Sequence, residues 1–250
     1  MVAERPKIRY SLKSATEAMR VALKDANALC DYVEYGLKTS VENRMSKVAE
    51  KIGFDDWGIY QYWTVIENET EFKKHIDSCL NGQNYGQVVT PELLYVIVRK
   101  LCPAIFVETG VAAGVSSAYI LKAMQDNNYG HLYSIDYPNF GLIEAQTVPL
   151  VGFAVPDNLK DRWTLLQGKS SDLLPQLLDS LGVIDIFMHD SEHSHNNMLF
   201  EYETSWMKLR EGGLLLSHDI NDNPAFKTFA SMVKHKYHEI FFTGMGVIRK

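Results

Sequence analysis

The segment from Phe106 to Ser117, Phe-Val-Glu-Thr-Gly-Val-Ala-Ala-Gly-Val-Ser-Ser, carries an acid and two glycines where an apolar run passes into a helical one. Ligands of doubly wound α/β sheets bind beyond the carboxyl ends of the strands, and glycines there let the backbone approach a ligand closely. The spacing of Gly110 and Gly114 lacks the GxGxxG pattern that seats a pyrophosphate, and Glu108 would repel phosphates. The loop therefore predicts a site for a ligand with a cationic amino group, unless its glycines serve only a tight turn.

A second acid, Asp136, follows the apolar run His131–Ile135. An acid at the tip of the next strand of such a sheet is placed to accept hydrogen bonds from two ribose hydroxyls. Taken alone, Asp136 is equally compatible with a solvated loop acid or a helix cap. Together with the glycine loop it predicts a nucleoside site.

Two further acids, Asp190 and Asp219, each follow an apolar run, so both are expected at one rim of the sheet. Converging carboxylates can hold Mg²⁺, which prefers oxygen ligands. His218 would supply a third ligand, and an imidazole suits Mn²⁺, Fe²⁺ or Zn²⁺ better than Mg²⁺. The alternative is that His218 and Asp219 cap the following helix or bond to its loop.

Histidines gather after the run that precedes Asp190, at His189, His193 and His195. Imidazole titrates near neutral pH, so each can act as a general base toward a hydroxyl. His193 is the predicted base because it lies just beyond the strand end, where an acceptor would sit, and Asp190 is expected to take part in the reaction. The alternative for any one of these histidines is a surface position in a polar loop.

The elements that must position these residues alternate between β-prone runs and helical segments, which implies right-handed crossovers and a parallel sheet covered on both faces. The last two β-prone runs are separated by Gly244 alone, so they must pair antiparallel. The predicted fold class is α/β: a Rossmann-like, doubly wound, mostly parallel seven-stranded sheet with an antiparallel C-terminal hairpin. The predicted strands are Ala104–Glu108, His131–Ile135, Thr164–Gln167, Ile184–His189, Leu214–Ser217, Glu239–Thr243 and Met245–Arg249.

Residues 1–81 are predicted to form a helical N-terminal extension or cap, and residues 82–250 the ligand-binding domain. Apolar residues recur at three- and four-residue steps from Ser11 to Lys38, which is typical of an amphipathic helix. Thr90 followed by Pro91 predicts the start of a helix that runs through Lys100. Two shorter helices are expected at Asn43–Ile52 and Thr70–Leu80.

An aromatic stretch separates the two shorter helices of the extension. Its rings either form a lid over an apolar acceptor or pack against a second subunit, which would give a homodimer through the N-terminal helices. The residues concerned are Trp57, Tyr60, Tyr62 and Trp63.

The composition limits the classes of partner. A formal net charge of −6 disfavours a nucleic-acid surface, which needs excess Lys and Arg, so a small molecule is the expected partner. The three cysteines, Cys30, Cys79 and Cys102, form no CxxC pair, which fits a reducing cytoplasm without disulfides or structural zinc. No run approaches the ~20 apolar residues that a membrane span needs, so no membrane partner is expected.

From Gln83 to Lys250 the ordered motifs resemble the class I S-adenosylmethionine-dependent methyltransferases, in the small-molecule O-methyltransferase branch with catechol O-methyltransferase-like and cephalosporin-hydroxylase-like proteins. The resemblance implies that Glu108 and the Gly110–Gly114 loop hold the methionine end of the cofactor, that Ser116 contacts its carboxylate, and that Asp136 holds the ribose. The segment Gly168–Leu177 resembles the part that lines the adenine, which indicates Ser170, and Gln87–Thr90 resembles the entrance segment that packs on the cofactor.

Resemblance to the metal-dependent members supports Asp190, which is also expected to touch the cofactor, as a metal ligand together with His218 and Asp219. Those relatives commonly carry Asp-Asn or Glu-Asp where this chain has His-Asp. The metal, if Mg²⁺ or Mn²⁺, would therefore be held by an altered ligand set.

The sequence thus predicts an enzyme that transfers a methyl group from S-adenosylmethionine to a hydroxyl of a small molecule, with possible metal assistance. A chain that keeps the cofactor-binding fold without turnover, as a regulatory module, is the alternative. An NAD-dependent oxidoreductase is disfavoured by the missing phosphate-binding glycines and by the terminal hairpin.

Overall fold

A computed structural model describes residues 50, 59–85, 88, 90–137, 151–240 and 244–250 of the chain. The chain divides into two compact units, Met1–Arg44 and Met45–Lys250, and all the described residues belong to the second. The helix predicted at Ser11–Lys38 lies outside the described residues, as does nearly all of Asn43–Ile52.

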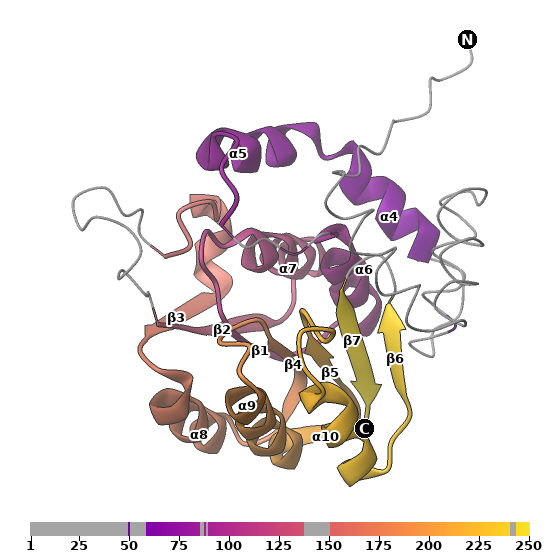
Figure 1. The fold of residues 1–250 in the computed structure, drawn as a ribbon. Coiled ribbons are helices and arrows are strands. Elements are labelled where there is room, and N and C mark those ends of the chain that lie inside the picture. Colours follow the sequence, from indigo (N-terminus) through magenta and orange to yellow (C-terminus); the bar gives the residue numbers. More distant parts are fainter. Residues whose placement is uncertain (1–49, 51–58, 86–87, 89, 138–150, 241–243) are drawn as a thin grey trace. The chain divides into compact units, whose positions relative to one another are not determined.

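The centre of the described unit is a seven-stranded sheet in the order β3-β2-β1-β4-β5-β7-β6 (Figure 1). The first five strands run parallel to their neighbours, whereas β7 pairs antiparallel with both β5 and β6. The predicted fold class is therefore confirmed. The strands are β1 (Ile105–Thr109), β2 (His131–Asp136), β3 (Trp163–Gln167), β4 (Ile184–His189), β5 (Leu209–Ser217), β6 (Tyr237–Ile240) and β7 (Met245–Arg249).

Helices cover both faces of this sheet. The central strands β1 and β4 are buried along nearly their whole length, as expected for strands covered on both faces. One face carries α6 and α7, with α4 packed on α6 and α5 on α7; the other carries α8, α9 and α10. The helices are α4 (Ile59–Asn68), α5 (Thr70–Leu80), α6 (Glu92–Leu101), α7 (Val115–Asn127), α8 (Ser170–Leu181), α9 (His195–Lys208) and α10 (Ala225–Val233), with a 3-10 turn at Asp157–Arg162.

Most predicted strands start within two residues of the observed ones, but two elements differ more from the sequence prediction. Helix α4 begins inside the aromatic stretch that was expected only to separate helices; it buries Ile59, Trp63 and Ile66, whose spacing of four and three residues places them on one face. Strand β5 begins at Leu209 and not at Leu214, because α9 passes directly into it and its register with β4 shifts after the first pair.

The aromatic stretch is divided between core and surface. Trp63 is buried in the packing of α4, the guanidinium of Arg99 lies 4.8 Å from the centre of the Tyr62 ring, and Tyr60 is exposed. Helices α4 and α5 belong to the same compact unit as the sheet. The boundary at residue 81 stays a prediction.

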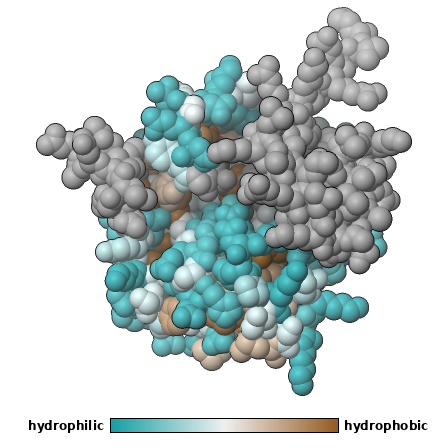
Figure 2. All heavy atoms as spheres, in the orientation of Figure 1, coloured by the Kyte–Doolittle hydropathy of each residue, from teal (hydrophilic) through white to brown (hydrophobic). Residues whose placement is uncertain are grey.

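The surface seen in Figure 2 is largely hydrophilic over the described residues, with hydrophobic residues in small areas. Exposed large hydrophobic side chains on the described unit include Val183, Met207 and Met232. None of the described helices is both long and apolar enough to cross a membrane.

Candidate active site

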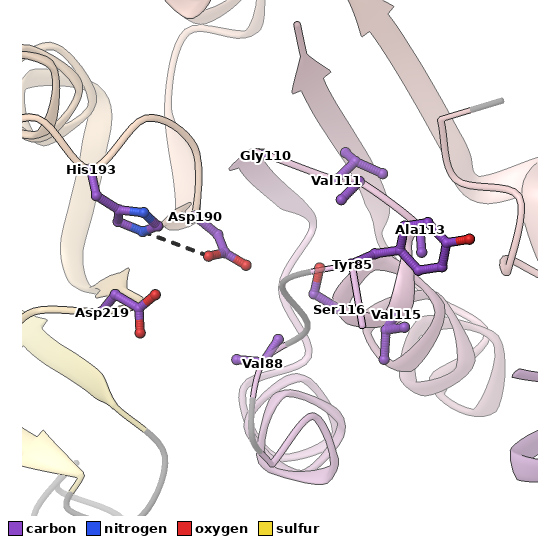
Figure 3. Close-up of a pocket in the computed structure, with 11 residues that line it drawn as sticks. Tyr85, Val88, Gly110, Val111, Ala113, Val115, Ser116, Asp190, His193 and Asp219 are labelled. Carbon is purple, nitrogen blue, oxygen red and sulfur yellow. Dashed lines mark ion pairs between the residues drawn. The ribbon is translucent and has the colours of Figure 1, made fainter. Parts of the chain in front are cut away.

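The candidate site lies where β1 and β4 meet. Strand β1 connects through α7 to β2 on one side and has β4 on its other side, so the crossovers diverge here and leave a crevice beyond the strand ends. A cavity of about 280 Å³ opens at this point (Figure 3). It is lined by Tyr85, Val88, Gly110, Val111, Ala112, Ala113, Val115, Ser116, Asp190, His193 and Asp219.

The two predicted glycines are required by contacts within the protein. Gly110 has φ +85°, and a Cβ there would lie 2.0 Å from the carbonyl oxygen of Asp190. Gly114 has φ +89°, and its Cβ would lie 2.8 Å from the Cα of Gly152. Residues other than glycine rarely adopt such φ values. The tight-turn interpretation therefore explains both glycines, while the loop between them also forms one wall of the cavity.

Asp136 holds this loop in place. Its Oδ2 accepts hydrogen bonds from the backbone N–H groups of Val111, at 2.7 Å, and Ala112, at 3.0 Å. Both bonds go to the same oxygen, and Oδ1 accepts none from the described residues. The loop therefore uses only one of the two carboxylate oxygens of Asp136.

Glu108 lies beneath the loop and does not line the cavity. Its carboxyl is fully buried and accepts hydrogen bonds from three hydroxyls, those of Ser117, Ser134 at 2.6 Å and Ser116 at 3.4 Å. Burial raises its pKa to about 7, against the opposite effect of these hydroxyls. Of the residues predicted for the methionine end, Ser116 reaches the cavity and Glu108 stands behind it.

Asp190, His193 and Asp219 line the opposite wall of the cavity, and His218 contacts both carboxylates. Nδ1 of His218 lies 2.9 Å from Oδ1 of Asp190 and 3.3 Å from Oδ2 of Asp219, and Nε2 of His193 lies 3.9 Å from Oδ1 of Asp190. Figure 3 shows Asp190 and His193 facing each other, with Asp219 on a separate segment. The cluster joins two strand ends because the backbone N–H of His218 donates to the carbonyl of His189.

The two carboxylates set the charge of His218. Burial alone would lower its pKa, but the contacts and charges of Asp190 and Asp219 outweigh burial and raise the pKa to about 10. Burial would raise the pKa of Asp219, yet contact with His218 and the charge of His218 hold it below its ordinary value. With no metal ion bound, His218 is therefore a cation between two anions at neutral pH.

His193 has the opposite character. Its pKa is lowered, first by burial and then by the positive charge of His189, against the raising effect of the nearby carboxylates. A neutral imidazole that lines the cavity can accept a proton. His189 is buried below the cavity and His195 begins α9, and neither lines the cavity. Of the three candidate histidines, the structure thus brings His193 alone to the cavity.

The donor atoms fit a cation site. Donor atoms of Asp190, His193 and His218 lie within 4.8 Å of one another, as do those of a second set, His193, Asp219 and Asp222. Nε2 of His193 and Nε2 of His218 are buried without a hydrogen-bond partner among the described residues, whereas Nδ1 of His218 contacts Asp190. Unpartnered buried nitrogens beside carboxylates are donors that a divalent metal would satisfy.

Ser170 lies at the first residue of α8 and does not line the cavity. Its hydroxyl is one of the groups that lower the pKa of the buried Glu201. Val88, which lines the cavity, belongs to the predicted entrance segment Gln87–Thr90. Sequence reasoning did not find Tyr85, which lines the cavity from the segment before α6, nor Glu201, which lies in the interior of α9. The position of Glu201 between Phe200 and Tyr202 in a helix was the available signal.

Residues 107–220, which include both walls of this cavity, match the model of a family described as a methyltransferase domain. This segment of the chain is therefore a methyltransferase domain. No curated protein matches the sequence of the chain.

Solved structures show the same fold at low sequence identity. An O-methyltransferase from Bacillus cereus, solved in complex with SAH, is 12% identical, with a TM-score of 0.53 over 73% of this chain and 92% of that chain. A Klebsiella pneumoniae protein, provisionally assigned as an O-methyltransferase, is 16% identical, with a TM-score of 0.54 over 84% of this chain and 99% of that one. The sheet and its helices are thus those of the O-methyltransferase fold.

Proposed function

We propose that this methyltransferase transfers the methyl group of S-adenosylmethionine to a hydroxyl of a small molecule held in the cavity at the ends of β1 and β4. The single observation that carries the proposal is that one cavity has the glycine loop on one wall and a proton-accepting His193 beside Asp190 on the other. A cofactor and an acceptor bound there would be in contact. The complex of the Bacillus cereus neighbour with SAH supports the choice of cofactor.

On the cofactor wall, Ser116 would contact the methionine carboxylate and Oδ1 of Asp136 the ribose. The loop needs no rearrangement for this, because Oδ2 of Asp136 already fixes the N–H groups of Val111 and Ala112. Glu108 would act on the cationic end of the cofactor through the hydroxyl of Ser116, since its carboxyl is enclosed. Ser170 is retained as the proposed adenine neighbour.

On the acceptor wall, His193 would accept the hydroxyl proton as the oxygen attacks the methyl group opposite the sulfur. Such transfer requires the oxygen, methyl carbon and sulfur to lie in line, and positioning alone can supply a large part of the rate. Asp190 would hold the resulting imidazolium, because its Oδ1 lies 3.9 Å from Nε2 of His193. Ser116 and His193 both face the cavity, so the acceptor would enter between them.

Asp190, His218 and Asp219 are the residues proposed to hold a divalent metal, with His193 left as the base. A bound metal would lower the pKa of the acceptor hydroxyl and orient it. The unpartnered Nε2 of His218, beside two carboxylates, carries this part of the proposal. An imidazole in the set favours Mn²⁺ over Mg²⁺.

The partner of the enzyme is proposed to be a small-molecule acceptor, with no nucleic acid or membrane, in agreement with the net charge of −6. Cys79 and Cys102 are free thiols, which supports the predicted reducing, cytoplasmic setting. The proposed homodimer through the N-terminal helices depends on residues outside those described.

The test combines binding with turnover. Calorimetry should show that the full chain binds S-adenosylhomocysteine but not NAD, and a panel of phenols and sugars with Mn²⁺ present should release S-adenosylhomocysteine from S-adenosylmethionine. His193→Ala should bind S-adenosylhomocysteine as the parent does, yet lose turnover by about 10²–10⁴-fold, the usual contribution of a general base. His131→Ala is the matched control: His131 lies at the first residue of β2, at the end remote from Asp136, so this variant should keep full turnover.

No binding of S-adenosylhomocysteine by the purified parent would contradict the proposal as a whole. Full turnover by His193→Ala would remove His193 as the base and leave the cofactor assignment standing.

A further inference from the structure

Glu201 is a buried carboxylate in the middle of α9, directly below the acceptor wall. It is completely inaccessible to solvent and accepts hydrogen bonds from four side chains. Oε2 accepts from Oγ1 of Thr109, at 2.5 Å, and from Nδ1 of His189, at 2.6 Å. Oε1 accepts from Oγ of Ser191, at 2.7 Å, and from Nδ2 of Asn197, at 3.2 Å. The donors come from the end of β1, the end of β4, the loop after β4 and the first turn of α9.

Three of these four donors are next to a residue of the site in the sequence. Thr109 immediately precedes Gly110, and His189 and Ser191 stand on either side of Asp190. Glu201 therefore fixes the backbone on both sides of Asp190 and the end of the neighbouring strand β1.

A second route from Glu201 leads to the proposed base. The rings of His189 and His193 meet edge to face, with their centres 5.2 Å apart. Because a carboxylate only accepts, the bond to Glu201 places a hydrogen on Nδ1 of His189 and fixes the plane of its ring. Asn197 extends the same network, since its Nδ2 also donates to the carbonyl of Glu192, at 3.0 Å, in the loop that carries His193.

Burying a carboxylate at this position of the helix carries a desolvation penalty that an apolar side chain of the same size would avoid. Burial raises the pKa of Glu201, but the hydrogen bond and charge of His189 and the hydroxyls of Ser170 and Thr109 outweigh it and keep the group ionised. The cofactor wall has its own anchor in Asp136. The Glu201 network therefore serves the acceptor wall in particular.

We propose that Glu201 is a positioning residue, which holds Asp190 through Ser191 and His189, and holds His193 through the ring of His189, in the arrangement needed for methyl transfer. Its effect on turnover rests on the proposed function, whereas its effect on the orientation of His193 does not. Removing the acceptor capacity of Glu201 should misplace the acceptor wall and leave the cofactor wall intact.

The experiment compares the parent with Glu201→Gln, which keeps the shape of the side chain but replaces one acceptor oxygen by a donor. The matched control is Asp185→Asn. Asp185 lies at the start of the same strand β4 and accepts from the backbone N–H groups of Ala104 and Ile105 and from Nε of Arg210, at the end remote from the cavity. Both carboxylates bond to residues of β1, but Glu201 does so at the strand end that adjoins the site and Asp185 at the opposite end.

Three quantities are measured on the full chain: the imidazole Cε1–H NMR signals of ring-labelled histidines, the affinity for S-adenosylhomocysteine, and turnover with an acceptor found in the panel. Glu201→Gln should shift the signals of His189 and His193 by more than their line widths while those of His131 and His235 stay in place. Affinity for S-adenosylhomocysteine should stay within about twofold, and kcat should fall at least about tenfold, as expected when reacting groups are misplaced by a fraction of an ångström. Asp185→Asn should leave the His193 signal and kcat unchanged.

An unmoved His193 signal in folded Glu201→Gln would overturn the proposal, as would equal losses of kcat and S-adenosylhomocysteine affinity, which would indicate general structural damage. If the parent itself does not bind S-adenosylhomocysteine, the methyl-transfer proposal fails, and the His193 signal still decides the role of Glu201. If Glu201→Gln does not fold, Thr109→Val removes one donor of the network and should move the signals of His189 and His193. Thr109→Ser keeps the hydroxyl, so these signals should stay where they are in the parent.

Discussion

Replacing Gly110 by alanine tests whether the approach of the glycine loop to Asp190 couples the two walls of the cavity. The added Cβ would lie 2.0 Å from the carbonyl oxygen of Asp190, 2.4 Å from its carbonyl carbon and 2.8 Å from the nitrogen of Ser191. All three are backbone atoms, so no side chain can turn aside to make room. Gly82 is the matched control: its φ of +74° is similar to the +85° of Gly110, but a Cβ there would meet nothing within 4 Å.

The structure sets the size of the effect. A left-handed backbone costs alanine about 1–2 kcal/mol, and both substitutions incur this cost. Gly110→Ala must also open a contact that is more than about 1 Å too short, and forcing such a shift in a packed region costs about 1–3 kcal/mol more. We therefore expect a loss of about 2–5 kcal/mol in the free energy of unfolding for Gly110→Ala, and about 1–2 kcal/mol for Gly82→Ala.

The assay is urea unfolding of both variants and the parent, followed by calorimetric titration with S-adenosylhomocysteine. Because the loop must move relative to Asp190, Gly110→Ala should bind S-adenosylhomocysteine at least about tenfold more weakly, by analogy with the cost of a 1 Å displacement in a site. Gly82→Ala should bind as the parent does. Equal unfolding free energies and equal affinities for the two variants would refute the argument that Gly110 is required by this contact.

Three further predictions concern buried acids and His218. Asp136→Ala leaves the N–H groups of Val111 and Ala112 without their acceptor, so it should lower the free energy of unfolding by about 1–3 kcal/mol and weaken S-adenosylhomocysteine binding in the same titration. The pKa of Glu108 is raised to about 7, so the folded chain binds its proton more tightly than the unfolded chain does. The free energy of unfolding should therefore fall by about 3 kcal/mol as the pH rises from 4.5 to 7, and Glu108→Gln should remove this fall. The pKa of His218 is raised to about 10, so its contribution to stability is complete below pH 6.5 and is lost as the pH rises to 10; the thermal midpoint should decline across this window, and less so in His218→Asn. A parent midpoint that is flat over that range would contradict the His218 prediction.

Much of the sheet could be predicted because strands and their ends are encoded locally. The runs Ile184–His189 and Met245–Arg249 appear in the structure with the predicted bounds, and the single Gly244 between the last two runs correctly implied an antiparallel pair. The strand ends then placed Asp190 and His218 at one rim without further information, since parallel strands share the direction of their carboxyl ends. Helix α4 was missed although its spacing of buried residues was present, because the aromatic stretch was interpreted as a separator.

The sequence by itself determined the class of fold, the glycine loop, and the rim on which the chemistry lies, because periodicity and turn residues act over a few positions of the chain. Only the tertiary structure decided what Glu108 and Glu201 do. Glu108 is enclosed by serines from α7 and β2, and Glu201 bonds to Thr109, which lies 92 positions away in the chain. Whether a buried acid faces a ligand or a ring of internal donors depends on how distant elements pack, and no local pattern records that packing.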